Sequence, residues 1–445
     1  MPKITHRKKR LSSFKLIVLG FAGVIVLGAL ILMLPFSSTA GVVTPFHEAL
    51  FTSTSAVCVT GLVVQDTGSY WSAFGQTVIL LLIQIGGLGV VTVAALFAML
   101  SGRKISLMQR STMQDAISAP KVGGIVRLTR FIVRGTFLIE LIGMIVMLPT
   151  FCGNYGFNGI WMAAFHSVSA FCNAGFDILG TAENKYPSLT GYIGNPAINI
   201  AIMLLIIVGG IGFLTWDDIY TNKWHFKKYR MQSKVILVTT AILIIVPAVF
   251  FFFCDFTGLP LAERILASLF QSVTPRTAGF NTADLPAMTG SSKAIMTMLM
   301  LVGGSPGSTA GGMKTTTLAV LILSAFSVCR KKDDAEVCGR RIDGSAVKNA
   351  AAVAVMYFLL FFVGGIVIST AEGLPLSTCL YETASAVGTV GLTLGITPQL
   401  GVLSQLILIV LMYLGRVGGL TLIYAAVSNK NHSGAKLPLE KITVG

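Results

Sequence analysis

Four segments of the chain share one pattern, a semi-apolar stretch that ends at a glycine. When they are aligned on that glycine, three of the four carry a serine six residues earlier. The segments read ALFTSTSAVCVTGL (49–62), AAFHSVSAFCNAGF (163–176), ASLFQSVTPRTAGF (267–280) and CLYETASAVGTVGL (379–392), and the aligned glycines are Gly61, Gly175, Gly279 and Gly391. Glycine permits backbone conformations that point carbonyl oxygens inward. A ring of such carbonyls from four loops can replace the water around a monovalent cation without adding net charge.

The sequence contains no complete motif for metal binding, redox chemistry, nucleotide binding or catalysis. The seven cysteines include no CxxC pair and the five histidines no HExxH spacing, so the sequence indicates no zinc or redox motif. Residues 307–315 nearly match a phosphate-binding P-loop, but Met313 stands where that pattern requires lysine, and no strand precedes it. No set of His, Asp and Ser gathers at one depth. We therefore expect no enzyme activity and no organic cofactor.

The elements that must position these loops are membrane-spanning helices. Hydrophobic residues make up 54% of the 445-residue chain and charged residues only 11%, whereas a soluble protein carries about 25% charged residues. An apolar run of about 20 residues can cross a bilayer as a helix. We predict eight, the first retained rather than removed as a signal peptide and only the sixth interrupted. They lie near residues 14–35, 74–100, 130–151, 196–216, 235–254, 293–328, 349–370 and 402–427.

The basic residues predict which side of the membrane each connection faces. With eight spans, 27 of the 33 Lys and Arg residues fall on one side, in 1–15, 101–134, 217–234, 329–348 and 428–445. The positive-inside rule makes that side the cytoplasm. We therefore expect a multi-pass protein of the plasma membrane with both termini cytoplasmic. The formal charge of +15 then suits contact with anionic membrane lipid, and we expect no nucleic-acid partner.

The connections on the opposite, outer side are acidic. Nine acidic residues lie there against four basic ones, and an acidic vestibule concentrates cations. Ordinary solvated loop charge explains any single one of the nine equally well. They are Glu48, Asp66, Asp177, Glu183, Asp255, Glu263, Asp284, Glu372 and Glu382.

A second glycine pattern recurs in the apolar run that follows each loop. It reads Ile85-Gly86-Gly87-Leu88-Gly89, Val208-Gly209-Gly210-Ile211-Gly212, GGSPGSTAGG (303–312) and Gly415-Arg416-Val417-Gly418-Gly419. We interpret the glycine pairs mainly as packing contacts between helices. Self-similarity of this kind indicates one structural unit used four times. Each unit is predicted to be a helix, a re-entrant short helix, an extended loop and a second helix.

The predicted fold is an all-α integral membrane protein with four helix–re-entrant pore loop–helix repeats around a pseudo-fourfold axis and eight transmembrane helices. Non-helical backbone at membrane depth is tolerated only inside protein or along a water-filled cavity, so the four loops would line one pore. The predicted divisions are a cytoplasmic tail (1–13), repeat 1 (14–100), repeat 2 with the preceding cytoplasmic loop (101–216), repeat 3 with a broken second helix (217–328), repeat 4 (329–427) and a second cytoplasmic tail (428–445).

The interrupted sixth run predicts a gate. Proline removes a backbone donor and glycine weakens a helix, so this stretch cannot stay regular. Arg416 falls at the same predicted depth in the fourth copy of the glycine pattern, and a charge inside a span normally faces the bundle interior or a water path. The alternative is a simple proline kink. The predicted gate residues are Gly303, Gly304, Ser305, Pro306, Gly307, Ser308, Thr309, Ala310, Gly311, Gly312, Lys314 and Arg416.

On these motifs the whole chain resembles the Trk/Ktr/HKT superfamily of potassium transporters, and within it the KtrB membrane subunits of bacterial Ktr potassium-uptake systems. The most specific parts are the four loop motifs, GGSPGSTAGGMKTT and the 415–419 segment. In that superfamily four aligned glycines favour potassium over sodium, although only the fourth loop approaches the TVGYG of potassium channels. The resemblance implies a selectivity filter of backbone carbonyls formed by Val59, Thr60, Gly61, Asn173, Ala174, Gly175, Thr277, Ala278, Gly279, Thr389, Val390 and Gly391.

The same resemblance implies partners and ions. The partners are a second copy of the chain, forming a homodimer, and a cytosolic ring of nucleotide-binding regulatory subunits of the Ktr type. Potassium is the implied substrate and sodium an accompanying ion that we cannot assign to residues. The main hypothesis is potassium uptake through a gated, channel-like pore. The alternatives are a sodium-coupled secondary cation transporter, which intramembrane carboxylates beyond Glu140 would favour, and a less selective K/Na conductor.

Overall fold

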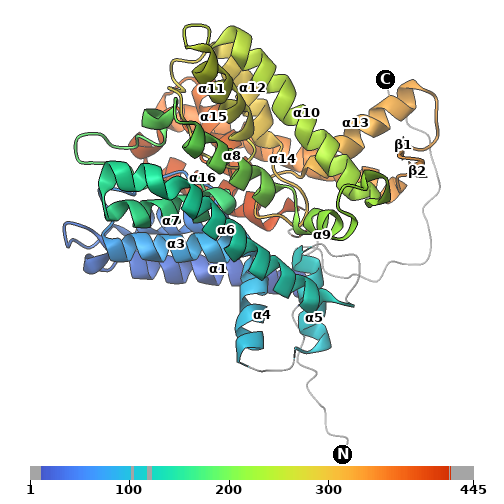
Figure 1. The fold of residues 1–445 in the computed structure, drawn as a ribbon, viewed down its shortest axis with the longest axis horizontal. Coiled ribbons are helices and arrows are strands. Elements are labelled where there is room, and N and C mark those ends of the chain that lie inside the picture. The colour runs from blue at the N-terminus through green and yellow to red at the C-terminus, as the bar shows by residue number, and fades with distance from the viewer. Residues whose placement is uncertain (1–11, 102–104, 118–122, 420, 422–445) are drawn as a thin grey trace, which may run out of the picture.

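The computed structural model describes residues 12–101, 105–117, 123–419 and 421. This part of the chain is almost entirely helical (Figure 1). Residues 1–11 of the predicted first tail, and all of the predicted second tail, lie outside the described residues. The helices are α1 (Ser13–Leu32), α2 (Phe46–Cys58), α3 (Ala73–Leu88), α4 (Val90–Leu100), α5 (Leu107–Ile117), α6 (Ile125–Tyr155), α7 (Asn158–Phe171), α8 (Pro196–Gly210), α9 (Phe213–Asn222), α10 (Met231–Cys254), α11 (Leu261–Val273), α12 (Gly290–Leu301), α13 (Thr315–Cys329), α14 (Gly344–Glu372), α15 (Leu376–Gly388) and α16 (Val402–Val417).

The only regular strands among the described residues form a small hairpin between α13 and α14. Its strands are β1 (Glu336–Val337) and β2 (Arg340–Arg341), which pair antiparallel. Four short 3-10 turns complete the described secondary structure, at Pro35–Ser37, Thr190–Tyr192, Phe226–Lys228 and Thr397–Gln399. The second strand of the hairpin consists of two exposed arginines.

Four helices of the described part are long and apolar enough to cross a membrane, namely α1, α6, α10 and α14. Their apolar side chains face outward as well as inward: Leu19, Ile142, Val246 and Leu359 are all exposed. Such surfaces are stable in lipid and not in water, because a soluble protein rarely leaves large contiguous apolar patches uncovered. The model therefore agrees with the membrane character that composition predicts.

The prediction that only the sixth apolar run is interrupted is wrong. The second run bends by 96° between α3 and α4, and the fourth bends by 98° between α8 and α9; Figure 1 shows α4 turned away from α3. The bends fall at Gly89 and Gly212, whose φ angles are +85° and +91°. L-residues rarely adopt this backbone region, so glycine is what permits each helix to stop there. Gly418, with φ +87°, ends α16 in the same way.

The predicted role of glycine in close helix packing belongs to Gly86, Gly209 and Gly415, which precede the glycines that end the helices. A Cβ atom on Gly86, Gly209 or Gly415 would collide with the carbonyl oxygen of Val57, Phe171 or Val387, respectively. Each of these carbonyls lies at the C-terminal end of a short helix, so the missing side chain lets α3, α8 and α16 lie directly against that end. The glycine pattern thus has two functions, close contact at its start and helix termination at its end.

Short helices α2, α7, α11 and α15 precede the four glycine loops, and each packs against the long helix before it. They have 13 or 14 residues, whereas about 20 are needed to span a bilayer. Three are tied to the long helix by a hydroxyl. Ser53 donates to Ile25 O at 2.7 Å, Ser167 to Glu140 O at 2.5 Å and Thr383 to Phe361 O at 3.0 Å.

The third short helix is displaced by one residue relative to the sequence alignment. The alignment matches Leu269 with the aromatic residues of the other copies, but Leu269 is half-buried and Phe270 is the fully buried ring. Likewise the hydroxyl expected at position 273, which is valine, comes from Thr274, which donates to Phe280 O. The hydroxyl of the third loop therefore stands five residues before its glycine, Gly279, rather than six.

Candidate functional site

The four aligned glycines meet in a closed ring. A Cβ atom on Gly61 would lie 2.5 Å from Ala174 O, and one on Gly175 would lie 2.5 Å from Ala278 O. On Gly279 and Gly391 the Cβ would lie closer still, to Val390 O and Thr60 O. Each glycine thus faces the carbonyl of the residue before the next glycine, and the fourth returns to the first. The loops have no room for a side chain at this position.

The backbone repeats itself through the four loops. The glycines have φ angles of +93°, +68°, +81° and +94°. Two residues earlier, the non-glycine residues Val59, Asn173, Thr277 and Thr389 are also left-handed, with φ of 56°, 59°, 70° and 52°. A non-glycine residue at positive φ is uncommon, and strain of this kind persists only where surrounding structure holds it. All twelve residues predicted to form the filter therefore belong to this repeated loop backbone, and all are buried.

Hydroxyl groups from the short helices hold this backbone, a role that we did not assign from the sequence. Ser55 Oγ accepts from Gly61 N at 3.0 Å, and Ser385 Oγ accepts from Gly391 N at 2.9 Å. Ser169 instead donates to Phe176 O at 2.7 Å, and Thr274 makes the matching bond in the third loop. The repeated serine six residues before the glycine is the signal that could have identified them.

Among the described residues, no hydrogen bond ends on the carbonyl oxygens of Thr60, Ala174, Ala278 or Val390. A buried carbonyl without a donor is unfavourable by roughly 1–3 kcal/mol, and such groups are rare in folded proteins. Four of them gathered in one ring form an arrangement that a cation with oxygen ligands would complete.

A hollow of about 250 Å³ opens on the side of the ring that faces the connections predicted as outer. We call it the outer hollow; all four ring glycines line it, together with Asp66 and Asp177. The Asp66 carboxylate already accepts hydrogen bonds from two backbone amides, from Ser69 N at 2.8 Å and from Tyr186 N at 2.9 Å. Among the described residues, the Asp177 carboxylate accepts a hydrogen bond from Leu179 N, at 3.1 Å. Burial, with a smaller contribution from the charge of Asp66, raises the pKa of Asp177 to about 7.

On the other side of the ring, the interrupted sixth run forms a loop rather than a kink. Helix α12 ends at Leu301 and α13 begins at Thr315. Between them the chain folds back on itself, with Gly303 N donating to Met313 O at 2.7 Å and Thr315 N to Gly304 O at 3.1 Å. The segment 302–314, which we call the intramembrane loop, contains every predicted gate residue except Arg416.

The intramembrane loop binds the second and fourth repeats beneath the ring. Its amides donate to the ends of other helices, from Ser305 N to Gly210 O at 2.9 Å, from Thr309 N to Gly209 O at 3.2 Å and from Gly312 N to Gly415 O at 3.1 Å. Thr309 Oγ1 also lies 3.1 Å from Phe171 O and 3.3 Å from Asn173 Oδ1. The loop therefore contacts the second filter segment itself.

Two basic side chains donate hydrogen bonds to carbonyls of this loop. Arg416 donates to Thr309 O, and also to Gly86 O and Gly87 O at the end of α3. Lys314 Nζ donates to Ala310 O at 2.8 Å and to Gly311 O at 3.3 Å. Three successive loop carbonyls, those of Thr309, Ala310 and Gly311, thus accept hydrogen bonds from basic side chains. The structure brings Arg416 and the loop together, as the sequence predicts, and adds α3 as the second binding site of the arginine.

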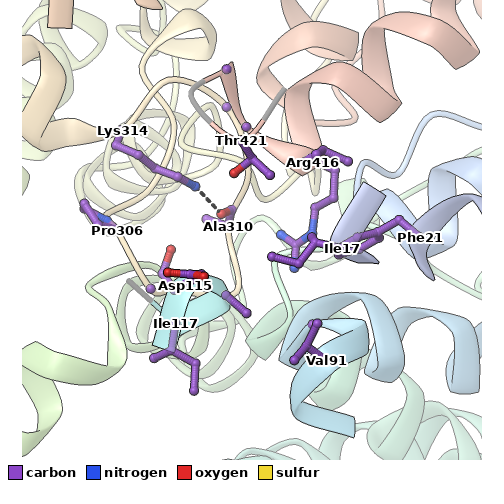
Figure 2. Close-up of a pocket in the computed structure, with 18 of the residues that line it drawn as sticks. Ile17, Phe21, Val91, Asp115, Ile117, Pro306, Ala310, Lys314, Arg416 and Thr421 are labelled. Carbon is purple, nitrogen blue, oxygen red and sulfur yellow. Dashed lines mark hydrogen bonds between the residues drawn. The ribbon is translucent and has the colours of Figure 1, made fainter. Parts of the chain in front are cut away.

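A second hollow, of about 310 Å³, lies beyond the loop. We call it the inner hollow, and Figure 2 shows Lys314, Ala310, Arg416 and Asp115 around it. Asp115 and Ile117 come from α5, a helix that the sequence did not connect with the site. A Cβ on Gly307 would lie 2.5 Å from Ile117 O, so the end of α5 contacts the loop directly.

Glu140, the carboxylate predicted within a span, lies outside both hollows. It is 5% exposed and accepts from Gln84 Nε2 at 3.1 Å. No group of three or more His, Cys, Asp or Glu side chains capable of holding a metal ion occurs in the described part of the chain.

Together these features define a multi-pass membrane protein with a narrow ring of backbone between re-entrant helices. The TrkH family model, whose description is "Cation transport protein", matches residues 23–433. The chain belongs to this family, as the loop motifs predict, and is a transport protein rather than an enzyme.

Individual relatives agree with this membership. The chain is 39% identical to the potassium/sodium uptake protein NtpJ of Enterococcus hirae, over 98% of each chain. It is 37% identical to the Ktr system potassium uptake protein B of Bacillus subtilis, over 92% of each. Its fold is similar to that of the potassium transporter TrkH from Vibrio parahaemolyticus, with a TM-score of 0.74, 19% identity and coverage of 96% of this chain and 87% of that one.

Asp177 predicts a pH dependence of cation transport. Because its pKa is about 7, this carboxyl is mostly charged at pH 8 and mostly neutral at pH 6, so attraction of cations into the outer hollow weakens as the pH falls through 7. We expect initial rates of rubidium uptake by cells expressing the protein, at low rubidium, to fall several-fold from external pH 8 to 6. Asp177→Asn should be slow and flat over this range, whereas Glu183→Gln, on an exposed loop, should follow the wild type. An unchanged pH profile in Asp177→Asn would contradict this role.

Proposed function

We propose that this chain takes up potassium through a gated, channel-like pore whose filter is the glycine ring. The observation that carries the proposal is the contrast between two sets of buried carbonyls. Those of the ring have no donor among the described residues, whereas those of the intramembrane loop are bound by Arg416 and Lys314. The ring carbonyls are therefore available to a mobile cation, whereas the carbonyls of the intramembrane loop are bound by the side chains of Arg416 and Lys314.

The filter consists of the twelve predicted residues of the four loops. Potassium loses its hydration shell only where several oxygens replace it together, and a closed ring of carbonyls does so without a net charge. The short helices point their C-terminal ends at the ring, which adds partial negative charge where the ion sits. Two relatives that match nearly the whole chain, one named as a potassium/sodium uptake protein and one as a potassium uptake protein, support potassium as the substrate.

The gate consists of the intramembrane loop and Arg416. A cation that leaves the ring on the loop side meets carbonyls that are already paired with positive charge, and the charges of Arg416 and Lys314 oppose its passage. Opening then requires Arg416 to release Thr309 O or the α3 carbonyls. Each such charge-assisted bond contributes about 1.5–3 kcal/mol, so a partner of modest binding energy suffices to move the loop.

The wider architecture belongs to the same proposal. The four repeats, divided as the sequence predicts, surround a pseudo-fourfold axis through the ring, with eight spans: the four long helices, the pairs α3–α4 and α8–α9, α12–α13 and α16. Both termini and the basic connections face the cytoplasm. There the protein binds a nucleotide-binding ring subunit of the Ktr type, and a second copy of the chain completes a homodimer in the plasma membrane. The relatives named for the Ktr system support the regulatory partner.

A second candidate is a conductor that discriminates less between potassium and sodium. One relative is named as a potassium/sodium uptake protein, and sodium dependence is part of the proposal for this chain. The two candidates differ in how strongly sodium competes at the ring, which the serine variants below measure.

Serine at any ring glycine should weaken the preference for potassium. A Cβ there meets the neighbouring carbonyl at 2.5 Å or less, so the ring must widen. A change of about 1.4 kcal/mol between the two ions lowers selectivity tenfold, and we expect a loss of about that size. The measurement is rubidium uptake against increasing sodium, for Gly61→Ser, Gly175→Ser, Gly279→Ser and Gly391→Ser. Gly41→Ser is the control, since Gly41 has φ +69° but open space. Wild-type competition in all four variants would exclude this filter.

Removal of Arg416 should open the gate without the regulatory partner. We expect Arg416→Ala to raise rubidium flux into proteoliposomes containing the chain alone by about tenfold or more, because at least one charge-assisted bond is lost. Arg264→Ala is the matched control, as Arg264 binds Phe252 O far along the chain from the loop. A flux that stays at the wild-type level, with sodium competition unchanged, would leave the loop as structure rather than gate.

A further inference from the structure

One of the four filter segments carries a charge that the other three lack. Three residues before the ring glycine stand Cys58, Cys172 and Gly388 in the first, second and fourth repeats, and Arg276 in the third. The backbone of Arg276 lies at the filter: Asn173 Nδ2, of the second filter segment, is 3.5 Å from Arg276 O. The ring is therefore electrically asymmetric although its backbone repeats.

The guanidinium of Arg276 is buried behind the third segment. The residue is 5% exposed, and within the described part of the chain its side chain makes one hydrogen bond, from Nη2 to Thr240 Oγ1 of α10, at 3.4 Å. Its Nε has no partner among the described residues. None of the ion pairs formed by the described part of the chain involves Arg276.

This charge is not neutralised locally. A guanidinium stays protonated in proteins, and its partner Thr240 is uncharged. The C-terminal end of α11, which precedes Arg276, supplies at most about half an elementary charge of opposite sign. Burial also removes the screening by water and salt that weakens surface charges. The filter therefore senses a net positive charge from one side.

We propose that Arg276 is a specificity residue that weakens cation binding in the ring and discriminates against divalent cations. This rests on the proposed function of the ring as filter. We take about 12 Å as the separation between the charge and Gly279, a distance within the reach of an arginine side chain and three residues of backbone. At an effective dielectric constant of about 20, one unit charge at that distance changes the affinity of a monovalent cation about tenfold.

The valence of the ion makes the proposal quantitative. Electrostatic energy scales with the charge of the bound ion, so the factor for a divalent cation is the square of the factor for a monovalent one. Weak binding is also useful, because a conducted ion must leave the filter as well as enter it. Arg276 thus favours release of monovalent ions while it opposes block by divalent ones.

The test measures rubidium uptake and its inhibition by barium, an ion of similar size to potassium and twice the charge. In Arg276→Gln we expect the KM for rubidium to fall several-fold and the inhibition constant of barium to fall by about the square of that factor. Arg276→Lys should restore both to within about twofold of the wild type, since it keeps the charge. If Arg276 had only a structural role, Arg276→Gln would lower the rate of rubidium uptake without lowering the barium inhibition constant by the square of the change in the rubidium KM.

A second pair of variants keeps the arginine in place. Thr240→Asp sets a carboxylate beside the guanidinium and should reproduce the changes of Arg276→Gln, whereas Thr240→Asn, of matched size, should behave as the wild type. If Arg276→Gln does not fold, the comparison of Thr240→Asp with Thr240→Asn tests the proposal in its place. Folded variants with wild-type KM and barium inhibition would overturn the proposal. If the wild type itself moved no rubidium, the proposed function would fail instead.

Discussion

A backbone carbonyl inside a membrane protein must find a donor or a cation, because the surrounding lipid offers neither. Much of this chain satisfies that requirement in the ordinary way, within helices. Besides the helix breaks at Gly89 and Gly212, two non-helical segments lie among the helices of the described part of the chain, the ring of four glycine loops and the intramembrane loop beneath it. The helices can be understood as the framework that allows those two segments.

The two places satisfy the requirement differently. In the intramembrane loop, amides of the loop bind Gly209, Gly210 and Gly415, and its own carbonyls are bound by Arg416 and Lys314. In the ring, the short helices and the serine hydroxyls fix the backbone but leave the carbonyls facing their neighbours. Carbonyls of the loop are therefore bound by side chains of the protein, whereas those of the ring have no donor among the described residues. This difference is the physical basis for assigning filter and gate.

Much of this arrangement could be predicted from residue patterns. Four copies of a glycine-ended segment predicted the loops, and the Gly/Pro interruption predicted non-helical backbone near Arg416. The prediction was wrong about which helices break, because glycine pairs that pack and glycines that end a helix look the same in a sequence. Gly86 and Gly89 are three residues apart, yet one contacts Val57 and the other turns the chain by about a right angle.

Other features could not be predicted because they depend on contacts between distant segments. Nothing in α5 indicates that Ile117 reaches Gly307, or that Arg416 binds the end of α3 as well as the loop. The one-residue displacement of α11 was hidden because Phe270 and Leu269 are both apolar, and only burial distinguishes them.

The most direct test of the account is to locate the ions. A crystal of the protein grown in rubidium, with anomalous diffraction collected at the rubidium edge, would show where a potassium-like cation binds. We predict a peak within the ring of Gly61, Gly175, Gly279 and Gly391, and none at the carbonyls of Thr309, Ala310 and Gly311 while Arg416 and Lys314 occupy them. An empty ring, or rubidium bound at the loop carbonyls with both side chains in place, would contradict the division between filter and gate.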